Sequence, residues 1–301
     1  MNTKVAFLIL HYMNADVTMN CIDSILSTMS QVALGIVVVD NASRNGSYEA
    51  LTKKYRDYKN VHFIENEENL GYARGNNVGF SYAKNTLGAE WICLANNDVV
   101  FSDMLWMEKV MDFYQRSPYY VLGPDIVTPD GLHQNPFRNG VAGKRSVIKS
   151  LLHDEVVYLL LKLGLQRKLR SKMNIKTNQN EMDWKESRED FKGVLHGSCL
   201  LFSPDYVKEF DGLYNGTFLY AEEEILCYVL NRLGYRYSYC REVQVMHCHA
   251  TSFKKSIQDE DKRKMVIVKN RIKSYRKFLK IVFSRKDVGR FLKRKYDIKV
   301  T

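Results

Sequence analysis

The sequence predicts an α/β protein with a mostly parallel, Rossmann-like central sheet, flanking helices and a basic helical extension at the C-terminus. Three observations support this fold class. Apolar runs typical of buried strands alternate with helix-like segments through the first 100 residues. Two of these apolar runs lead into an acid, at Asp40 and at Asp98, where open parallel sheets bind their ligands. Basic residues are concentrated after residue 253.

The predicted elements follow a βαβαβ order. Val5–Leu10 is a continuous apolar strand. A helix over residues 15–29 follows, because Val17, Cys21, Ile25 and Met29 recur at near-helical spacing. The remaining predictions are strands at Gly35–Asp40, Val61–Ile64 and Trp91–Ala95, and helices over residues 47–58 and Gly71–Ala83. Strands separated by crossover helices predict a parallel sheet.

Composition limits the class of protein. Hydrophobic residues make up 45% and charged residues 26% of the 301, as in ordinary globular proteins. No apolar run is long enough to predict a transmembrane helix. The 6 Cys form no CxxC pair, which favours buried thiols in a reducing cytoplasm.

The net charge of +11 is unevenly distributed. Residues 254–301 hold 18 Lys and Arg against 5 Asp and Glu, so the other 253 residues sum to −2. A near-neutral body argues against a nucleic-acid-binding domain, whose binding face is positive. The basic tail predicts attraction to an anionic surface, such as the inner face of the plasma membrane.

The segment Asn96-Asn97-Asp98 places a carboxylate in an apolar run. At a strand end this carboxylate can hold a divalent metal. Asn and Asp also favour turns for local reasons, so a simple turn is the alternative interpretation. Asp40 presents the same choice between contacting a ligand and capping the turn that follows it.

A glycine-rich polar segment runs from Asn69 to Gly79 and opens a predicted helix. Its glycines allow close backbone approach, Arg74 offers a bidentate donor, and Asn76 and Asn77 offer amides. This combination suits a phosphate- or ribose-bearing ligand at a helix start. The dinucleotide fingerprint GxGxxG is absent. A polar loop that caps a helix is the alternative.

Two further clusters lie downstream. Glu222, Glu223 and Glu224 are adjacent, and crowding with partial burial raises carboxylate pKa values toward the range of a general base. A helix N-terminus also favours acids, which is the alternative explanation. His247 and His249 lie two apart on a predicted strand and can face one metal, although a hydrogen-bonded core histidine is commoner.

Together these motifs resemble the family 2 glycosyltransferases, most closely the bacterial rhamnosyltransferase-like branch that builds surface polysaccharides. The resemblance spans residues 3–252. It rests on the ordered motifs Asp40-Asn41-Ala42-Ser43, Asn69-Leu70-Gly71, Gly75-Asn76-Asn77, Asn96-Asn97-Asp98, Gly197, Glu222-Glu223 and His247 to Ser252.

The resemblance implies a GT-A fold and an inverting transfer of a sugar from a UDP- or dTDP-sugar to a hydroxyl of a glycan or lipid-linked acceptor. It implies a nucleotide-sugar-binding half at residues 1–125 and an acceptor half at 126–252. The implied donor contacts are Asn14, Asp40, Arg74, Asn76, Asn77 and Asn97. Asp98 and His247 would hold Mg²⁺ or Mn²⁺. Glu223 would deprotonate the acceptor, which Glu222 and Gly197 would bind.

Two departures from the family pattern concern the site. The metal motif keeps one carboxylate, Asp98, and Glu223 stands where the family has Asp. A processive synthase is disfavoured because transmembrane helices and a Gln-x-x-Arg-Trp motif are missing. A nucleotidyltransferase is disfavoured because it would need a basic, Gly-rich N-terminal loop, and Leu10-His11-Tyr12-Met13-Asn14 is not one. Retention of Asp98, Glu223 and His247 together disfavours an inactive nucleotide-sugar-binding module.

These motifs leave residues 144–180 and the tail, residues 253–301, unexplained. The apolar and basic portion 144–176 is typical of a helix that lies on a membrane. In the tail, apolar side chains step by three and four among Lys and Arg, at Met265, Val268, Ile272, Tyr275, Leu279 and Val282. Such a stripe more often packs on the protein's own core or on a dimer partner. Membrane association through residues 144–176 and 254–301 and a homodimer are both expectations to test.

Overall fold

The computed structural model describes residues 4–29, 34–165, 185–248 and 260–293. Its strands are β1 (Val5–His11), β2 (Leu34–Asp40), β3 (Val61–Glu65), β4 (Trp91–Asn96), β5 (Val99–Val100), β6 (Val121–Val127), β7 (Cys199–Phe202) and β8 (Tyr237–His247). Its helices are α1 (Ala15–Thr28), α2 (Ser47–Tyr55), α3 (Gly71–Asn85), α4 (Trp106–Arg116), α5 (Lys144–Lys162), α7 (Pro204–Glu209), α8 (Glu222–Leu233), α10 (Glu260–Val282) and the 3₁₀ helix η1 (Gly289–Phe291).

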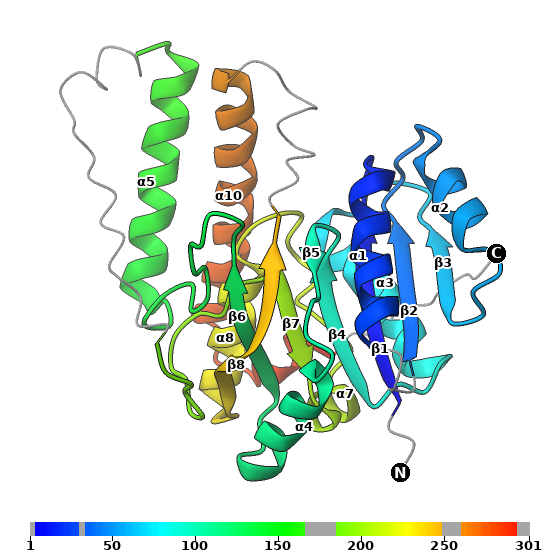
Figure 1. Cartoon of the computed structure of the whole chain (residues 1–301). Coiled ribbons are helices and arrows are strands. Elements are labelled where there is room, and N and C mark those ends of the chain that lie inside the picture. Colours follow the sequence, from blue (N-terminus) through cyan, green and yellow to red (C-terminus); the bar gives the residue numbers. More distant parts are fainter. Residues whose placement is uncertain (1–3, 30–33, 166–184, 249–259, 294–301) are drawn as a thin grey trace.

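Within the described residues, the strands form one sheet in the order β3-β2-β1-β4-β7-β6-β8-β5, with helices on both faces (Figure 1). Each face has its own buried core. One core packs α1, α2 and α4 against the sheet, and the other packs α3, α7, α8 and α10. This three-layer arrangement confirms the predicted α/β class.

The strands β3, β2, β1 and β4 run parallel, as the βαβ order predicted. Side chains alternate between the cores: Phe7 and Ile9 of β1 enter one, and Ala6 and Leu8 enter the other. Because helices cover both faces, these strands read as continuous apolar runs. The predicted boundaries hold within a few residues.

Glycines let α3 lie close to the sheet. A Cβ on Gly79 would stand 2.1 Å from Cδ1 of Leu8, and one on Gly75 would stand 2.7 Å from Cδ1 of Leu10. The close approach expected of these glycines is therefore to the chain's own strand β1, not to a ligand.

The sheet changes direction at β7. This strand pairs antiparallel with β4, where Ala95 lies opposite Cys199, and antiparallel with β6. Beyond β6, β8 pairs parallel and the short β5 pairs antiparallel with β8. Because β7 runs backward, it begins at the edge where β4 ends. Segments from both halves of the chain therefore meet at this edge.

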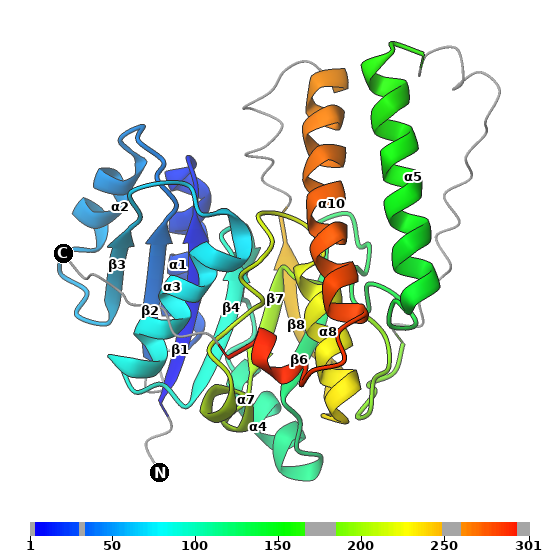
Figure 2. The same cartoon turned by 180° about the vertical axis from the view of Figure 1, so that it is seen from behind.

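The basic tail is an integral part of the fold. Phe278 and Ile281 of α10 are completely buried in the core that also holds β4 and β7. Val268 and Ile272 form a smaller core with Leu161 of α5, and the two helices lie side by side (Figure 2). The apolar stripe expected in the tail therefore packs within the chain and is not available to a membrane. The boundary expected near residue 252 lies outside the described residues and stays a prediction.

The insert expected at residues 144–180 contains α5, while its residues 166–180 lie outside the described part of the chain. No helix in the described residues is both long enough and apolar enough to span a membrane.

Candidate active site

Asp98 and His247, far apart in the sequence, are neighbours at the carboxyl edge of the sheet. Nε2 of His247 lies 3.1 Å from Oδ1 of Asp98. The ladder between β5 and β8 sets this contact, since Val99 pairs with His247 and the N–H of Cys248 donates to the carbonyl of Asp98 at 2.9 Å. The side chains are only 9% and 12% exposed. The structure thus brings together the two residues expected to hold a metal; His249 lies outside the described residues.

Two residues that sequence reasoning missed surround His247. Oε1 of Gln134 lies 2.7 Å from Nδ1 of His247, and the ring of His196 packs edge-on against the His247 ring at 5.8 Å. Both come from the long connection between β6 and β7. No local motif marks them, because their role depends on tertiary contacts.

The hydrogen bonding of His247 fits a cation site. Since the Gln134 oxygen accepts the proton of Nδ1, a neutral His247 turns the lone pair of Nε2 toward the Asp98 carboxylate. Two electron-rich atoms at 3.1 Å repel each other unless a proton or a metal ion lies between them. The described residues contain no cluster of three or more His, Cys, Asp or Glu arranged for a metal ion. An ion bound here would therefore complete its shell with phosphate oxygens and water, as Mg²⁺ commonly does.

The three acids at the start of α8 follow an unusual backbone turn. Tyr220 and Ala221 both adopt left-handed φ angles, 73° and 69°. Such conformations cost about 1–3 kcal/mol each in non-glycine residues and cluster at functional sites. The turn places Glu222 in a buried position and leaves Glu223 partly exposed.

Burial raises the pKa of both carboxyl groups. The pKa of Glu223 rises to about 7, with the charge of Glu224 adding to the burial and that of Arg138 opposing it. The pKa of Glu222 rises to about 8, because burial is reinforced by the charge of Glu223. A carboxyl group that ionises near neutral pH is matched to general base catalysis.

Glu223 faces Gly197. A Cβ added to Gly197 would stand 3.5 Å from Oε2 of Glu223, so the space between the glycine and the carboxylate would accommodate a methyl group. The hydroxyl of Tyr72 donates to the carbonyl of Gly197 at 2.6 Å. Burial, with the charges of Glu223 and Glu222, raises the pKa of Tyr72 and keeps its hydroxyl protonated. Gly197 thus lies between a candidate base and a fixed donor.

The segment from His196 to Ser198 joins the two clusters. His196 contacts His247, Gly197 faces Glu223, and the carbonyl of Ser198 accepts the N–H of Asn96 at 2.8 Å. This short segment therefore lies between the candidate metal pair and the candidate base.

Glu224 is held from two sides. Nη2 of Arg138 donates to its Oε2 at 2.8 Å, and the hydroxyl of Tyr275 on α10 donates to its Oε1 at 2.8 Å. Its carboxylate is therefore committed to a buried network next to Glu223. The sequence predicts neither Arg138 nor Tyr275 as a site residue, because each acts through Glu224.

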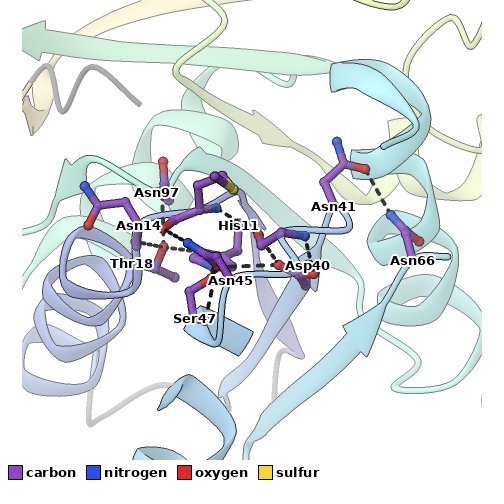
Figure 3. A network of polar contacts seen from close by, with 11 residues as sticks. His11, Asn14, Thr18, Asp40, Asn41, Asn45, Ser47, Asn66 and Asn97 are labelled. Carbon is purple, nitrogen blue, oxygen red and sulfur yellow. Dashed lines mark hydrogen bonds and ion pairs between the residues drawn. The ribbon is translucent and has the colours of Figure 1, made fainter. Parts of the chain in front are cut away.

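Asp40 ends β2 and is completely buried. Ser43 donates both its N–H, at 2.9 Å, and its hydroxyl to this carboxylate. Nε2 of His11 lies 3.7 Å from Asp40 and 2.8 Å from the hydroxyl of Ser47. Burial lowers the pKa of His11 to about 4 despite the opposing charge of Asp40, so the ring is neutral. Asp40 therefore holds the loop after β2, as the turn interpretation describes (Figure 3).

Asn14 and Asn97 lie on either side of Thr18 (Figure 3). Asn14 caps α1 through the N–H of Val17, at 3.5 Å. Nδ2 of Asn97 donates to the Thr18 hydroxyl at 3.0 Å, and that hydroxyl also contacts the carbonyl of Asn14 at 3.1 Å. Both asparagines are partly exposed, so they remain accessible from the edge of the sheet.

The polar residues of α3 differ in their surroundings. Arg74 is exposed. Asn77 uses both ends of its amide on the backbone of Leu213, at 2.7 Å each, and so anchors that loop. Asn76 donates to the carbonyl of Tyr72 at 3.0 Å, while its buried Oδ1 has no hydrogen-bond partner among the described residues. The expected donor contact therefore stays a prediction for Arg74 and Asn76, and Asn77 has a structural role.

Solved structures share this fold. The 1–349 chain of S. aureus TarS in complex with UDP superposes with a TM-score of 0.55 at 13% identity, covering 96% of this chain and 68% of that chain. TarS in complex with UDP-GlcNAc gives the same TM-score and identity, covering 96% and 69%. GalNAc-T7 with UDP, GalNAc and Mn²⁺ gives 0.57 at 13% identity, covering 82% and 44%. At such identities the likeness shows the fold alone, which is the GT-A fold of glycosyltransferases.

A curated relative is the low-salt glycan biosynthesis hexosyltransferase Agl10 of Haloferax volcanii. It is 25% identical over 231 residues, which cover 75% of this chain and 62% of Agl10. The chain therefore spans less than two thirds of the relative's length.

The profile of the family described as glycosyl transferase family 2 matches residues 7–170. The match begins in β1, includes Asp98 and covers more than half of the chain, whereas Glu223 and His247 lie beyond it. Because this profile covers more than half of the chain, the chain belongs to glycosyl transferase family 2.

Proposed function

We propose that this protein transfers a hexosyl or deoxyhexosyl group from a nucleotide diphosphate-sugar to a hydroxyl of a saccharide or lipid-linked saccharide, with inversion, in surface polysaccharide synthesis. The observation that carries the proposal is the position of Glu223. Its carboxyl group has a pKa of about 7 and faces Gly197, whose neighbour His196 contacts His247. A base for the acceptor and a candidate site for the donor diphosphate thus share one edge of the sheet.

On the acceptor side, Glu223 takes the proton. The acceptor oxygen forms a bond to the anomeric carbon while the bond from that carbon to the diphosphate oxygen breaks and its electron pair leaves with the nucleotide. Glu223 accepts the hydroxyl proton as this occurs, because an alcohol is too weakly acidic to react unaided near neutral pH. Attack opposite the leaving group inverts the anomeric centre. Glu222 and Gly197 would lie against the acceptor.

On the donor side, Asp98 and His247 would hold Mg²⁺ or Mn²⁺. A divalent cation there would neutralise the charge that develops on the leaving diphosphate. Asn14 and Asn97 would contact the nucleotide from the adjoining edge, and Arg74 is an exposed guanidinium that suits a phosphate.

Two further residues at this edge refine the donor pocket. Asp40 would act on the nucleobase through the loop it holds, because its carboxylate is buried. Tyr12, 39% exposed at the end of β1, offers a ring on which a base can stack. Solved structures of the same fold carry UDP, which favours UDP over dTDP as the nucleotide to test first.

Thermal denaturation tests the donor assignment. UDP, UDP-sugars and dTDP-sugars are added with and without Mn²⁺ to the wild type, to Asp98→Asn and to the control Asp57→Asn, whose side chain is exposed on the surface. We expect a nucleotide to raise Tm by mass action, and Mn²⁺ to raise it further in the wild type and control but not in Asp98→Asn. No stabilisation by any nucleotide would refute the donor class. Binding without product formation for any acceptor would favour a non-catalytic binding module.

A further inference from the structure

We propose that one face of α5 docks on an anionic lipid surface. The face consists of the apolar residues Ile148, Leu152, Val156, Leu159 and Leu163, and we call it the α5 stripe. This assignment is independent of the donor and base roles proposed above. It replaces the tail stripe of α10, which is buried within the chain, as the surface that meets the membrane.

The α5 stripe is exposed along its whole length. Its side chains are 37%, 56%, 57%, 54% and 58% exposed, from Ile148 to Leu163. They recur at spacings of three and four and therefore line one side of the helix. The opposite side of α5 is already used, since Val147 and Leu161 are buried in contact with the rest of the chain. Isolated exposed apolar residues are normal, but a continuous row marks an interaction surface.

Basic residues border the α5 stripe. Helical spacing places Lys149 on one flank and Lys144 and Lys162 on the other, while Arg145 lies at the N-terminal end of the stripe; all four are exposed. Arg145 and Lys149 share one open surface of α5 with Ile148, Leu152, His153 and Val156. An apolar row between cations is the pattern that inserts into the headgroup region of an anionic bilayer.

Charge favours a lipid surface over a second copy of this chain. The helices α5 and α10 together carry 13 Lys and Arg against 4 Asp and Glu. The acid beside the α5 stripe, Glu155, already pairs with Arg276 at 2.8 Å, and Asp154 pairs with Arg271 at 3.0 Å. Two copies meeting through this face would bring their basic flanks together, whereas anionic headgroups would neutralise them.

The arm formed by α5 and α10 is placed to present this surface near the active site. Both helices project past the carboxyl ends of the parallel strands, the edge that carries Asp98 and His247 (Figures 1 and 2). α10 is also tied to α8 and to the loop before it, since Ser274 donates to the carbonyl of Leu219 at 2.8 Å and Tyr275 bonds Glu224. Docking of α5 on a membrane would therefore hold the edge that carries the candidate site at a fixed place relative to the lipid.

Vesicle sedimentation without any sugar donor tests the proposal. Wild-type protein is mixed with vesicles of phosphatidylcholine alone or of phosphatidylcholine with phosphatidylglycerol. We expect binding to the anionic vesicles that weakens at high salt. Leu152→Gln with Val156→Gln removes apolar area without changing charge, and we expect partitioning to fall by about tenfold or more. The control, Tyr58→Gln with Met104→Gln, alters two exposed apolar side chains elsewhere and should bind like the wild type.

A second pair of variants tests the charged flanks. Arg145→Gln with Lys149→Gln should weaken binding to anionic vesicles more than Lys53→Gln with Lys59→Gln, which changes net charge equally. The proposal is overturned if the wild type ignores both vesicles or if the Leu152/Val156 variant binds undiminished. It is also overturned if light scattering shows a dimer that this variant dissociates, which would assign the α5 stripe to a second copy. None of these results bears on turnover, so the failure of one proposal leaves the other intact.

Discussion

Gly197 faces Glu223 at the edge of the sheet: a Cβ built on the glycine would stand 3.5 Å from Oε2 of the carboxylate. This spacing is an ordinary van der Waals distance, so the fold has room for a methyl group there. The same methyl group would occupy space beside the base where an acceptor hydroxyl must approach.

We therefore expect Gly197→Ala to fold normally and to lower kcat/KM for the acceptor by roughly 10- to 100-fold. Gly193→Ala is the matched control for stability, because its Cβ would meet the carbonyl oxygen of Arg138 at 2.1 Å. It should lower Tm clearly. Steady-state kinetics and thermal denaturation of both variants check this contrast. Full activity in Gly197→Ala would show that the acceptor does not approach Glu223 over this glycine.

Glu223→Gln should lower kcat by about 10²- to 10⁴-fold, because the amide cannot take the proton of the acceptor. UDP affinity, measured by calorimetry, should stay near the wild-type value. In the wild type, activity should rise with pH up to about 7 and then level, because only the ionised carboxylate acts as a base. Glu90→Gln, an exposed surface change, is the control. Unchanged turnover in Glu223→Gln would sink the assignment of the base.

Arg138→Met should move the pH dependence of kcat to higher pH. The positive charge of Arg138 lowers the pKa of Glu223, so its removal makes the base harder to ionise. Activity should recover at alkaline pH, where Glu223 ionises even without the charge of Arg138. Arg236→Met serves as a control, since Arg236 instead bonds the hydroxyl of Ser117 at 2.8 Å. This account would be contradicted if the midpoint of the pH dependence of kcat stays in place or moves to lower pH in Arg138→Met.

Glu222→Gln should raise the Tm at pH 8 by a few degrees. The native pKa of Glu222 is about 8, above the ordinary value of 4.5, so its contribution to stability is full below pH 4.5 and is lost as pH rises through 8. Gln carries no such penalty at high pH. The gain over the wild type should therefore shrink as pH falls toward 4.5 and be absent in Glu90→Gln. A gain that is constant with pH would point to packing instead.

Local patterns in the sequence predicted the first half of the fold well. Strands β1 to β4 are buried on both faces, so each reads as an uninterrupted apolar run with a crossover helix between neighbours. The glycines of α3 predicted a close backbone approach, but the sequence could not show what approaches them. In the structure, Gly79 lies against Leu8 of β1. The spacing of apolar residues in the tail also predicted a helix with one apolar face. The structure confirms the interpretation that this face packs on the protein's own core.

Local patterns also predicted some residues of the candidate site and not others. Asp98, Glu223 and His247 could be selected because a carboxylate in an apolar run, a cluster of acids and a histidine at a strand end each stand out locally. Gln134 and Arg138 could not, because neither stands in a local motif and each matters only through a contact with His247 or Glu224. The sequence predicted that Asp40 ends a strand, but it could not predict that the carboxylate is buried, because burial depends on Ser43 folding back over it.

Because β7 runs antiparallel to its neighbours, the edge of the sheet that carries the candidate site can stay constant while the connection between β6 and β7 varies. The chain leaves the site edge after β6, passes through α5 and returns to the same edge at Gly197 and β7. Backbone pairing of Ala95 with Cys199 then sets where Gly197 lies relative to the end of β4, whatever the length of the excursion. Arg138 and Val194 pair with each other, so the part of the excursion between them, which contains α5, can change without moving Gln134 or His196. We expect related proteins to change their anchoring surface by replacing this part while the edge of the sheet stays the same.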